Sequence, residues 1–248
     1  MYDVDVKRKV LCGVPLIDYI PKEVENKRII FFLHGYSCSK TNGSFENCLQ
    51  LSTRGFRVIS IDAYGHGERM EKPFPQGNYK KEMENFYKLM ERTAFDVKEI
   101  YSNHFQTIYP SLNLVGESMG GMLSFIIPTI VPEVYGIGSV VGSPSLLTYG
   151  YEDMIYNKCK EEEIKGTLDY LERYDAMYNL ELFKNKKIYI INGKQDDIVP
   201  AKHAEEFVRQ MRKRFNKQDI IYDLRDCNHW SPQEASDLMY DWADENFK

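Results

Sequence analysis

Short, strongly apolar runs alternate with longer amphipathic segments along this chain, and this alternation limits the possible folds more than any other feature. A run that is apolar at nearly every position is typical of a strand buried on both faces of a parallel sheet. The amphipathic segments between such runs predict helices that connect one parallel strand to the next. The runs that we expect to form strands are residues 28–33, 56–61, 111–115, 135–141, 186–191 and 219–224.

The expected helices complete an α/β pattern, a doubly wound and mostly parallel sheet with helices on both of its faces. The last helix has the clearest start signal, with Ser231 as the N-cap, Pro232 at the first helical position and Glu234 at the third. Residues 6–21 (VKRKVLCGVPLIDYIP) predict an antiparallel pair of strands at the edge of the sheet. The expected helices cover residues 44–53, 82–105, 118–127, 201–215 and 232–247.

The length and composition of the chain favour one domain. Its 248 residues are 43% hydrophobic, which is enough to bury the core of a large α/β domain, and there are no internal repeats or low-complexity linkers. The segment at about 144–184 is longer than a crossover needs, and it is helical in composition and rich in tyrosine. We therefore expect residues 1–248 to form a single domain with a small helical cap inserted at about 144–184. The cap's tyrosines fit either the wall of a binding site or a helix packed onto the domain.

Charge and cysteine usage exclude several classes of partner. The formal net charge is -5 with both signs spread along the chain, which argues against a nucleic-acid partner. The most basic stretch, residues 209–217, is expected to be the solvated face of a helix. The five cysteines are widely spaced without a C-x-x-C pair, so we expect reduced thiols in a cytoplasm and neither a disulfide framework nor a zinc site.

No segment has the pattern of a signal peptide or a membrane span. The N-terminal residues lack an apolar core, and the longest apolar run, near 123–131, is interrupted and well short of the ~20 residues that a span requires. We therefore expect a soluble, cytoplasmic protein without a membrane partner.

The stretch LNLVGESMGGML (112–123) places one serine among three glycines, between an expected strand and an expected helix. Gly116 and Gly120 lack the Cβ atoms that would collide in a sharp turn, so Ser118 can project its hydroxyl at the carboxyl edge of the sheet, where ligands bind. Pro128 and Pro132 should end or kink the following helix early. The motif G-x-S-x-G is short, and an ordinary strand–helix turn is the alternative interpretation.

A serine hydroxyl needs a base to act as a nucleophile. Our candidate is His229, which lies between the last expected strand and the last expected helix, at the same edge of the sheet as Ser118. His34 and His66 lie nearer the N-terminus, whereas His104 and His203 fall within expected helices and should be at the surface.

The base needs a carboxylate to fix its tautomer. Residues 191–200 (INGKQDDIVP) offer Asp196 and Asp197 in a loop at the same edge, and we favour Asp196. Asp223 and Asp226 are nearer to the histidine in sequence but should lie on or beside the final strand.

An oxyanion at this site would need two N–H donors. The backbone N–H of Met119, at the helix start, is one candidate, and that of Tyr36, in the loop that follows the strand 28–33, is the other. A plain strand–helix turn at His34 and Gly35 is the alternative.

Several motifs together resemble the α/β-hydrolase superfamily, near the small bacterial serine carboxylesterases of the dienelactone-hydrolase and acylaminoacyl-peptidase branches. The resemblance implies the α/β-hydrolase fold, a modest cap after the sixth main strand, no cofactor or metal, and Asp196 as the acid four residues before a V-P proline. It implies a loop-shaping role for His66 and Arg69. The motifs are LHGYS (33–37), DAYGHGER (62–69), GESMGG (116–121), INGKQDDIVP (191–200) and CNHW (227–230).

The expected function is therefore that of a serine carboxylesterase acting on small-molecule esters of small or medium acyl groups through an acyl-enzyme. A thioesterase or an acylaminoacyl-peptidase-like hydrolase would use the same residues. A non-catalytic binding module on the same scaffold is the alternative from another class. The sequence gives no indication of the oligomeric state.

Overall fold

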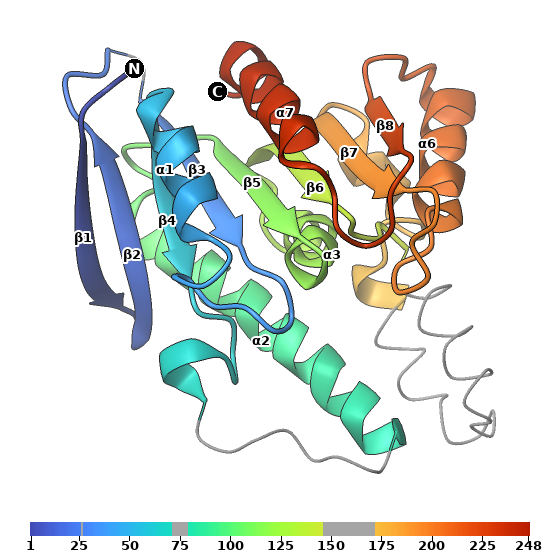
Figure 1. Ribbon diagram of the computed structural model, residues 1–248, viewed down its shortest axis with the longest axis horizontal. Helices are drawn as coiled ribbons and strands as arrows, with labels where there is room; N and C mark the ends of the chain where they lie inside the picture. Colours follow the sequence, from blue (N-terminus) through green and yellow to red (C-terminus); the bar gives the residue numbers. More distant parts are fainter. Residues whose placement is uncertain (26, 71–78, 146–171) are drawn as a thin grey trace.

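The computed structural model describes residues 1–25, 27–70, 79–145 and 172–248 (Figure 1). Most of the expected cap at about 144–184 lies outside these described residues. Among the residues that are described, none of the helices combines the length and apolar character needed to cross a bilayer.

The centre of the molecule is an eight-stranded sheet with the order β1-β2-β4-β3-β5-β6-β7-β8. The antiparallel β1–β2 pair lies at one edge, β2 is also antiparallel to β4, and all the other neighbours are parallel. The strands are β1 (Val4–Leu11), β2 (Val14–Pro21), β3 (Arg28–Leu33), β4 (Phe56–Ile61), β5 (Leu112–Glu117), β6 (Val134–Val140), β7 (Lys187–Gly193) and β8 (Ile221–Arg225).

Helices cover both faces of this sheet (Figure 1). The helices that pack on it are α1 (Phe45–Thr53), α2 (Tyr79–His104), α3 (Met119–Ile126), α6 (Lys202–Phe215) and α7 (Gln233–Asn246). The described residues also form three short 3₁₀ turns: η1 (Gly67–Arg69), η2 (Ile127–Thr129) and η3 (Leu180–Phe183).

Alternate residues of each central strand enter different cores, as the two-residue period of a strand requires. In β3, Phe31 packs with the buried residues of α2, α3 and α6, whereas Ile30 and Phe32 pack with those of α1 and α7. Both faces of the strand are thus covered, which explains why it is apolar at nearly every position. The chain has the predicted doubly wound architecture of the α/β-hydrolase fold.

The last helix begins one residue later than predicted. Pro232 flanks α7 in an extended conformation, with its carbonyl accepting from the N–H of Ala235, and the side chain of Ser231 caps nothing. The prediction of Ser231 as the N-cap is therefore wrong. Helix α3 ends at Ile126 and passes into η2, which contains Pro128, as expected for a residue that cannot continue the hydrogen-bond ladder.

Two predictions of exposure on α6 and just beyond it are also wrong. His203 is only 4% exposed, because it lies beside Ala204 on the face of α6 that packs against the sheet. Lys217 is buried and pairs with Asp219 at 2.8 Å, although the preceding Arg209, Arg212, Lys213 and Arg214 are exposed as expected. Periodicity within a helix shows which residues share a face. It does not show the partner of Lys217, which lies beyond the helix and depends on the path of the loop that follows.

Candidate active site

Three side chains singled out in the sequence follow the carboxyl ends of parallel strands. Ser118 comes directly after β5, Asp196 lies in the loop after β7, and His229 lies in the loop after β8. Because these strands run parallel, their ends meet at one edge of the sheet.

The three side chains form a continuous hydrogen-bonded chain. His229 Nε2 lies 2.9 Å from Ser118 Oγ, and His229 Nδ1 lies 2.8 Å from Asp196 Oδ2. The other carboxylate oxygen of Asp196 accepts from the backbone N–H groups of Ile198 and Val199 at 3.0 and 2.8 Å. This buried carboxylate is therefore fixed on both sides, and it holds the imidazole with its Nε2 toward the serine.

The other aspartates considered for this position lie elsewhere. Asp197 is exposed. Asp223, on β8, accepts from Arg225 at 2.5 Å, and Asp226 accepts from Gln195 at 2.5 Å. None of these three has a hydrogen bond to His229 in the described part of the chain.

Ser118 alone joins β5 to α3, and its backbone is strained. Its φ of 53° and ψ of -113° lie in a region that a residue with a Cβ rarely adopts. A Cβ at Gly116 would overlap the carbonyl oxygen of Gly120, and a Cβ at Gly120 would overlap that of Leu33. The two glycines therefore allow the helix to approach β3 and β5 closely enough for this turn, as predicted.

Two backbone segments adjoin the serine where an oxyanion would form. Met119 is the first residue of α3, so its N–H has no partner within the helix. The loop after β3 passes close by, because a Cβ at Gly35 would lie 3.7 Å from Ser118 Cβ. Tyr36, the next residue, lines the same cavity as Ser118 and His229.

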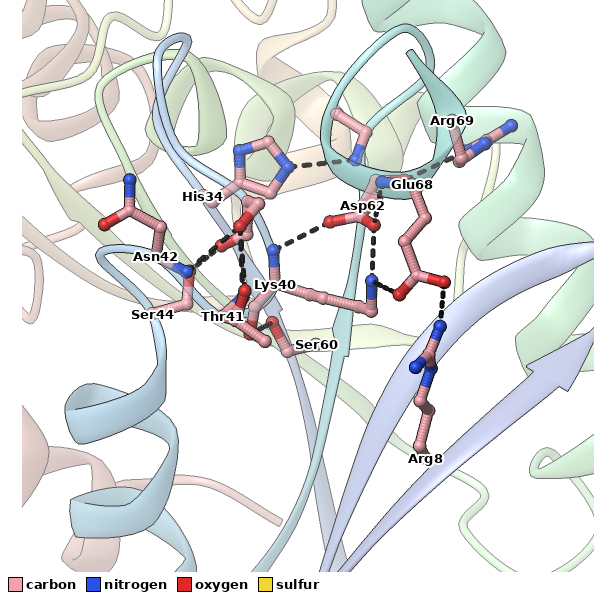
Figure 2. Close-up of polar contacts among 12 residues, drawn as sticks. Arg8, His34, Lys40, Thr41, Asn42, Ser44, Ser60, Asp62, Glu68 and Arg69 are labelled. Carbon is pink, nitrogen blue, oxygen red and sulfur yellow. Dashed lines mark hydrogen bonds and ion pairs between the residues drawn. The ribbon is translucent and has the colours of Figure 1, made fainter. Parts of the chain in front are cut away.

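His34 holds the start of this loop and is separate from the serine site. Its Nε2 accepts from the N–H of Ala63 at 2.9 Å (Figure 2). Its Nδ1 lies 2.7 Å from the carbonyl oxygen of Gly35. Burial lowers the pKa of His34 to about 4, so the ring is neutral at pH 7 and donates from Nδ1.

A buried ion pair fixes the far end of the same loop (Figure 2). Lys40 and Asp62 are 3% and 0% exposed, and the Asp62 carboxylate accepts from both the backbone N–H and the Nζ of Lys40, at 2.9 and 2.5 Å. It also accepts from the N–H of Glu68 at 2.9 Å, and the Glu68 carboxylate pairs with Lys40 and with Arg8 of β1. The loop that contains Tyr36 is thereby tied to the DAYGHGER segment and to the edge of the sheet.

His66 and Arg69 contact the residues that shape the loop after β3 and the DAYGHGER segment. Arg69 donates to the backbone oxygen of Asp62 at 3.0 Å and to Asp96 of α2 at 2.7 Å, while the buried ring of His66 lies 5.3 Å from the ring of Tyr36. These contacts support the expectation that both residues shape the loop.

A cavity of about 410 Å³ opens beside the serine. Its lining includes Ser118, His229 and Tyr36, together with the apolar side chains of Val141, Ile198 and Trp230. A small ester fits a space of this size. Within the described ranges, no group of three or more His, Cys, Asp or Glu side chains is placed to hold a metal ion.

Residues 44–248 match the sequence profile of the prolyl oligopeptidase family. The chain belongs to this family. YitV of Bacillus subtilis (strain 168), which carries an esterase name, is 20% identical over 256 residues, covering 96% of this chain and 98% of its own. Esterase YjfP of Escherichia coli (strain K12) is 22% identical over 207 residues, covering 80% and 81%. The crystal structure of TT1662 from Thermus thermophilus aligns with a TM-score of 0.79 at 19% identity over 98% of both chains.

As a member of the prolyl oligopeptidase family with the α/β-hydrolase fold, the chain is a serine hydrolase. Sequence reasoning did not single out Lys40, Asp62 or Glu117 at this site. The available sequence signal was that Asp62 lies in the motif DAYGHGER (62–69) and Glu117 in the motif GESMGG (116–121). Their roles depend on which charges lie opposite them, and a linear pattern does not contain that information.

Proposed function

We propose that this chain hydrolyses carboxylic esters of small or medium acyl groups through an acyl-enzyme intermediate on Ser118. The observation that carries the proposal is the hydrogen-bonded chain from Ser118 Oγ through His229 to the buried Asp196. A neutral histidine that is oriented by a carboxylate is the base that a serine nucleophile needs.

In the proposed reaction, His229 Nε2 takes the proton of Ser118 as its Oγ attacks the ester carbonyl. The backbone N–H groups of Tyr36 and Met119 stabilise the oxyanion of the tetrahedral intermediate. As that intermediate collapses, His229 gives its proton to the departing alcohol, and an ester bond to Ser118 remains. Water, deprotonated by His229, then attacks this acyl-enzyme, and the carboxylic acid leaves while Ser118 recovers its proton. Asp196 stabilises the imidazolium in both steps.

The preference for small and medium acyl groups rests on the cavity of about 410 Å³ and its apolar side chains. The domain assignment, one domain over residues 1–248 with a cap at about 144–184, is also a proposal. It rests on the sequence alone, because residues 146–171 lie outside the described part.

The substitution Ser118→Ala tests the proposed nucleophile. We expect turnover of 4-nitrophenyl butyrate and labelling by a fluorophosphonate probe both to be lost, with the thermal midpoint nearly unchanged. Ser102→Ala removes the same atom from the exposed face of α2 and should retain both signals. Persistent turnover in Ser118→Ala would contradict the assignment of the nucleophile.

A substrate panel separates the activities that could share this machinery. We expect the wild type to cleave 4-nitrophenyl butyrate with a higher kcat/KM than either the uncharged thioester S-(4-nitrophenyl) thiobutyrate or the amide N-acetyl-alanine 4-nitroanilide. A preference for the thioester or the anilide would replace the ester assignment, and absence of both turnover and labelling would favour a binding module.

We also propose a cytoplasmic location and no nucleic-acid partner. The described cysteines, Cys12, Cys38, Cys48 and Cys227, are all free thiols, which fits a reducing compartment. The net charge of -5 is unfavourable for binding a polyanion.

A further inference from the structure

One ionisable group of the cavity has no part in the proposed reaction. Glu117 ends β5, directly before Ser118, and it lines the same cavity as Ser118 and His229. Asn47 of α1 donates from Nδ2 to Glu117 Oε1 at 2.8 Å. This is the single side-chain hydrogen bond of Glu117 within the described residues, and no lysine, arginine or histidine there forms an ion pair with it.

The groups that face Glu117 from the surrounding elements are neutral at pH 7. Cys38 lies in the loop after β3, Cys48 in α1 and Tyr240 in α7, and burial raises the pKa of each of these side chains. The lining of the cavity contains no lysine or arginine in the described part of the chain, and its remaining titratable group of opposite sign, His229, is held by Asp196.

Burial raises the pKa of Glu117 to about 7, and the hydrogen bond from Asn47 opposes this rise. The carboxyl therefore ionises near neutral pH, and no cation among the described side chains pairs with its charge. A negative charge in the wall of a cavity repels an anionic ligand and attracts a cation, and the effect is stronger in a partly desolvated site than in water.

The aromatic residues that line the cavity also favour a positively charged ligand. Tyr36 and Trp230 line the cavity, and aromatic faces attract ammonium groups. An ammonium ion is thus favoured by both a carboxylate and aromatic rings, whereas an uncharged hydroxyl can donate only one hydrogen bond to the carboxylate.

We propose that this cavity selects esters that carry an ammonium group and that Glu117 is the residue that selects them. The inference rests on the proposed esterase function and names a substrate class for it. It assigns Glu117 to binding, where the ammonium group of the ligand supplies the positive charge that no described side chain places beside this carboxylate.

The test uses two pairs of esters whose members differ by an ammonium or a hydroxyl group. One pair has the charge on the alcohol, 4-(aminomethyl)phenyl acetate against 4-(hydroxymethyl)phenyl acetate. The other has it on the acyl group, ethyl 3-aminopropanoate against ethyl 3-hydroxypropanoate. For at least one pair, we expect Glu117→Gln to lower the ratio of kcat/KM, ammonium over hydroxyl, by about tenfold or more relative to the wild type.

Glu46→Gln is the matched control, because Glu46 carries the same group on the exposed start of α1 and does not line the cavity. It should leave the ratio at the wild-type value. Equal ratios in the wild type and Glu117→Gln for both pairs, with all esters cleaved, would overturn this inference alone. If the wild type cleaves 4-nitrophenyl butyrate but none of these four esters, the inference alone is overturned. Failure to cleave 4-nitrophenyl butyrate as well would overturn the esterase function and, with it, the inference.

A second measurement needs no substitution. Benzylamine and benzyl alcohol are compared as competitive inhibitors of 4-nitrophenyl butyrate hydrolysis by the wild type, at the same pH for both. We expect benzylamine to bind about tenfold more tightly near pH 8 and to lose this advantage toward pH 6, as Glu117 takes up a proton. Equal inhibition constants at both pH values would overturn the inference.

Discussion

At the scale of single residues, burial and contact with His229 distinguish two aspartates that look equivalent in the sequence. Asp196 and Asp197 are adjacent, yet Asp196 is 6% exposed and bonded to His229 whereas Asp197 is exposed. Consecutive residues in a loop point in different directions, so their contacts depend on the course of that loop. The sequence favoured Asp196 of this pair, and the hydrogen bond to His229 distinguishes it from Asp197.

Asp196→Asn should lower kcat by about a thousandfold or more, because an amide favours the wrong tautomer of the imidazole and does not stabilise its positive charge. The matched control is Asp197→Asn, which should stay within a few-fold of the wild type. Steady-state hydrolysis of 4-nitrophenyl butyrate measures kcat for both variants. A large loss in the control together with a small loss in Asp196→Asn would reverse the assignment.

At the scale of elements, the loop between β3 and α1 is held by contacts that no local pattern contains. His34 and Lys40 are joined to the segment after β4, and Glu68 of η1 links this assembly to β1. A buried charge is tolerated only when it is paired and hydrogen-bonded, so the Lys40–Asp62 pair ties the two loops together. We regard Lys40 as a positioning residue for the proposed donor at Tyr36.

Lys40→Met should lower the free energy of unfolding by about 3–5 kcal/mol, because it leaves Asp62 buried without its cation. We also expect kcat for 4-nitrophenyl butyrate to fall by about tenfold or more with little change in KM, since the loop with Tyr36 loses its anchor. Urea unfolding and steady-state kinetics, at a temperature where the variant is folded, measure the two effects.

The control for this substitution is Lys9→Met, which breaks another lysine–aspartate pair, at 2.6 Å, while Asp18 keeps its contact with Arg57. It should cost less stability and leave kcat at the wild-type value. Adding Asp62→Asn to Lys40→Met should recover part of the stability. An unchanged kcat in folded Lys40→Met would show that Lys40 has a structural role only.

At the scale of the whole molecule, two buried titratable groups act on stability with opposite signs. The pKa of His34 falls to about 4, so its contribution is present above pH 6.5 and is lost as the pH falls toward 4. The pKa of Glu117 rises to about 7, so its contribution is present below the unfolded pKa of 4.5 and is lost as the pH rises through about 7. Between these limits the two effects oppose each other.

Glu117→Gln should separate the two effects. The free energy of unfolding of this variant relative to the wild type should increase steadily from about pH 5 to about pH 8, because only the wild type must ionise a partly desolvated carboxyl over this range. His34 is present in both proteins and cancels in the difference. Urea titrations at several pH values measure it, with Glu46→Gln as a control that should show a flat difference. A flat difference for Glu117→Gln as well would contradict the raised pKa.

The sequence by itself determined the order of strands and helices, the turn at Ser118 and the candidates that follow parallel strands, because periodicity and glycine spacing are local properties. Only the tertiary structure decided that Asp196 bonds to His229, that His203 is buried, and that Lys40 pairs with Asp62. It also decided that Glu117 lines the cavity with no lysine or arginine beside it among the residues that the structure describes. Burial and pairing depend on residues that are distant in sequence, and their energies are fixed only when the folded chain brings those residues within a few ångströms and excludes water between them.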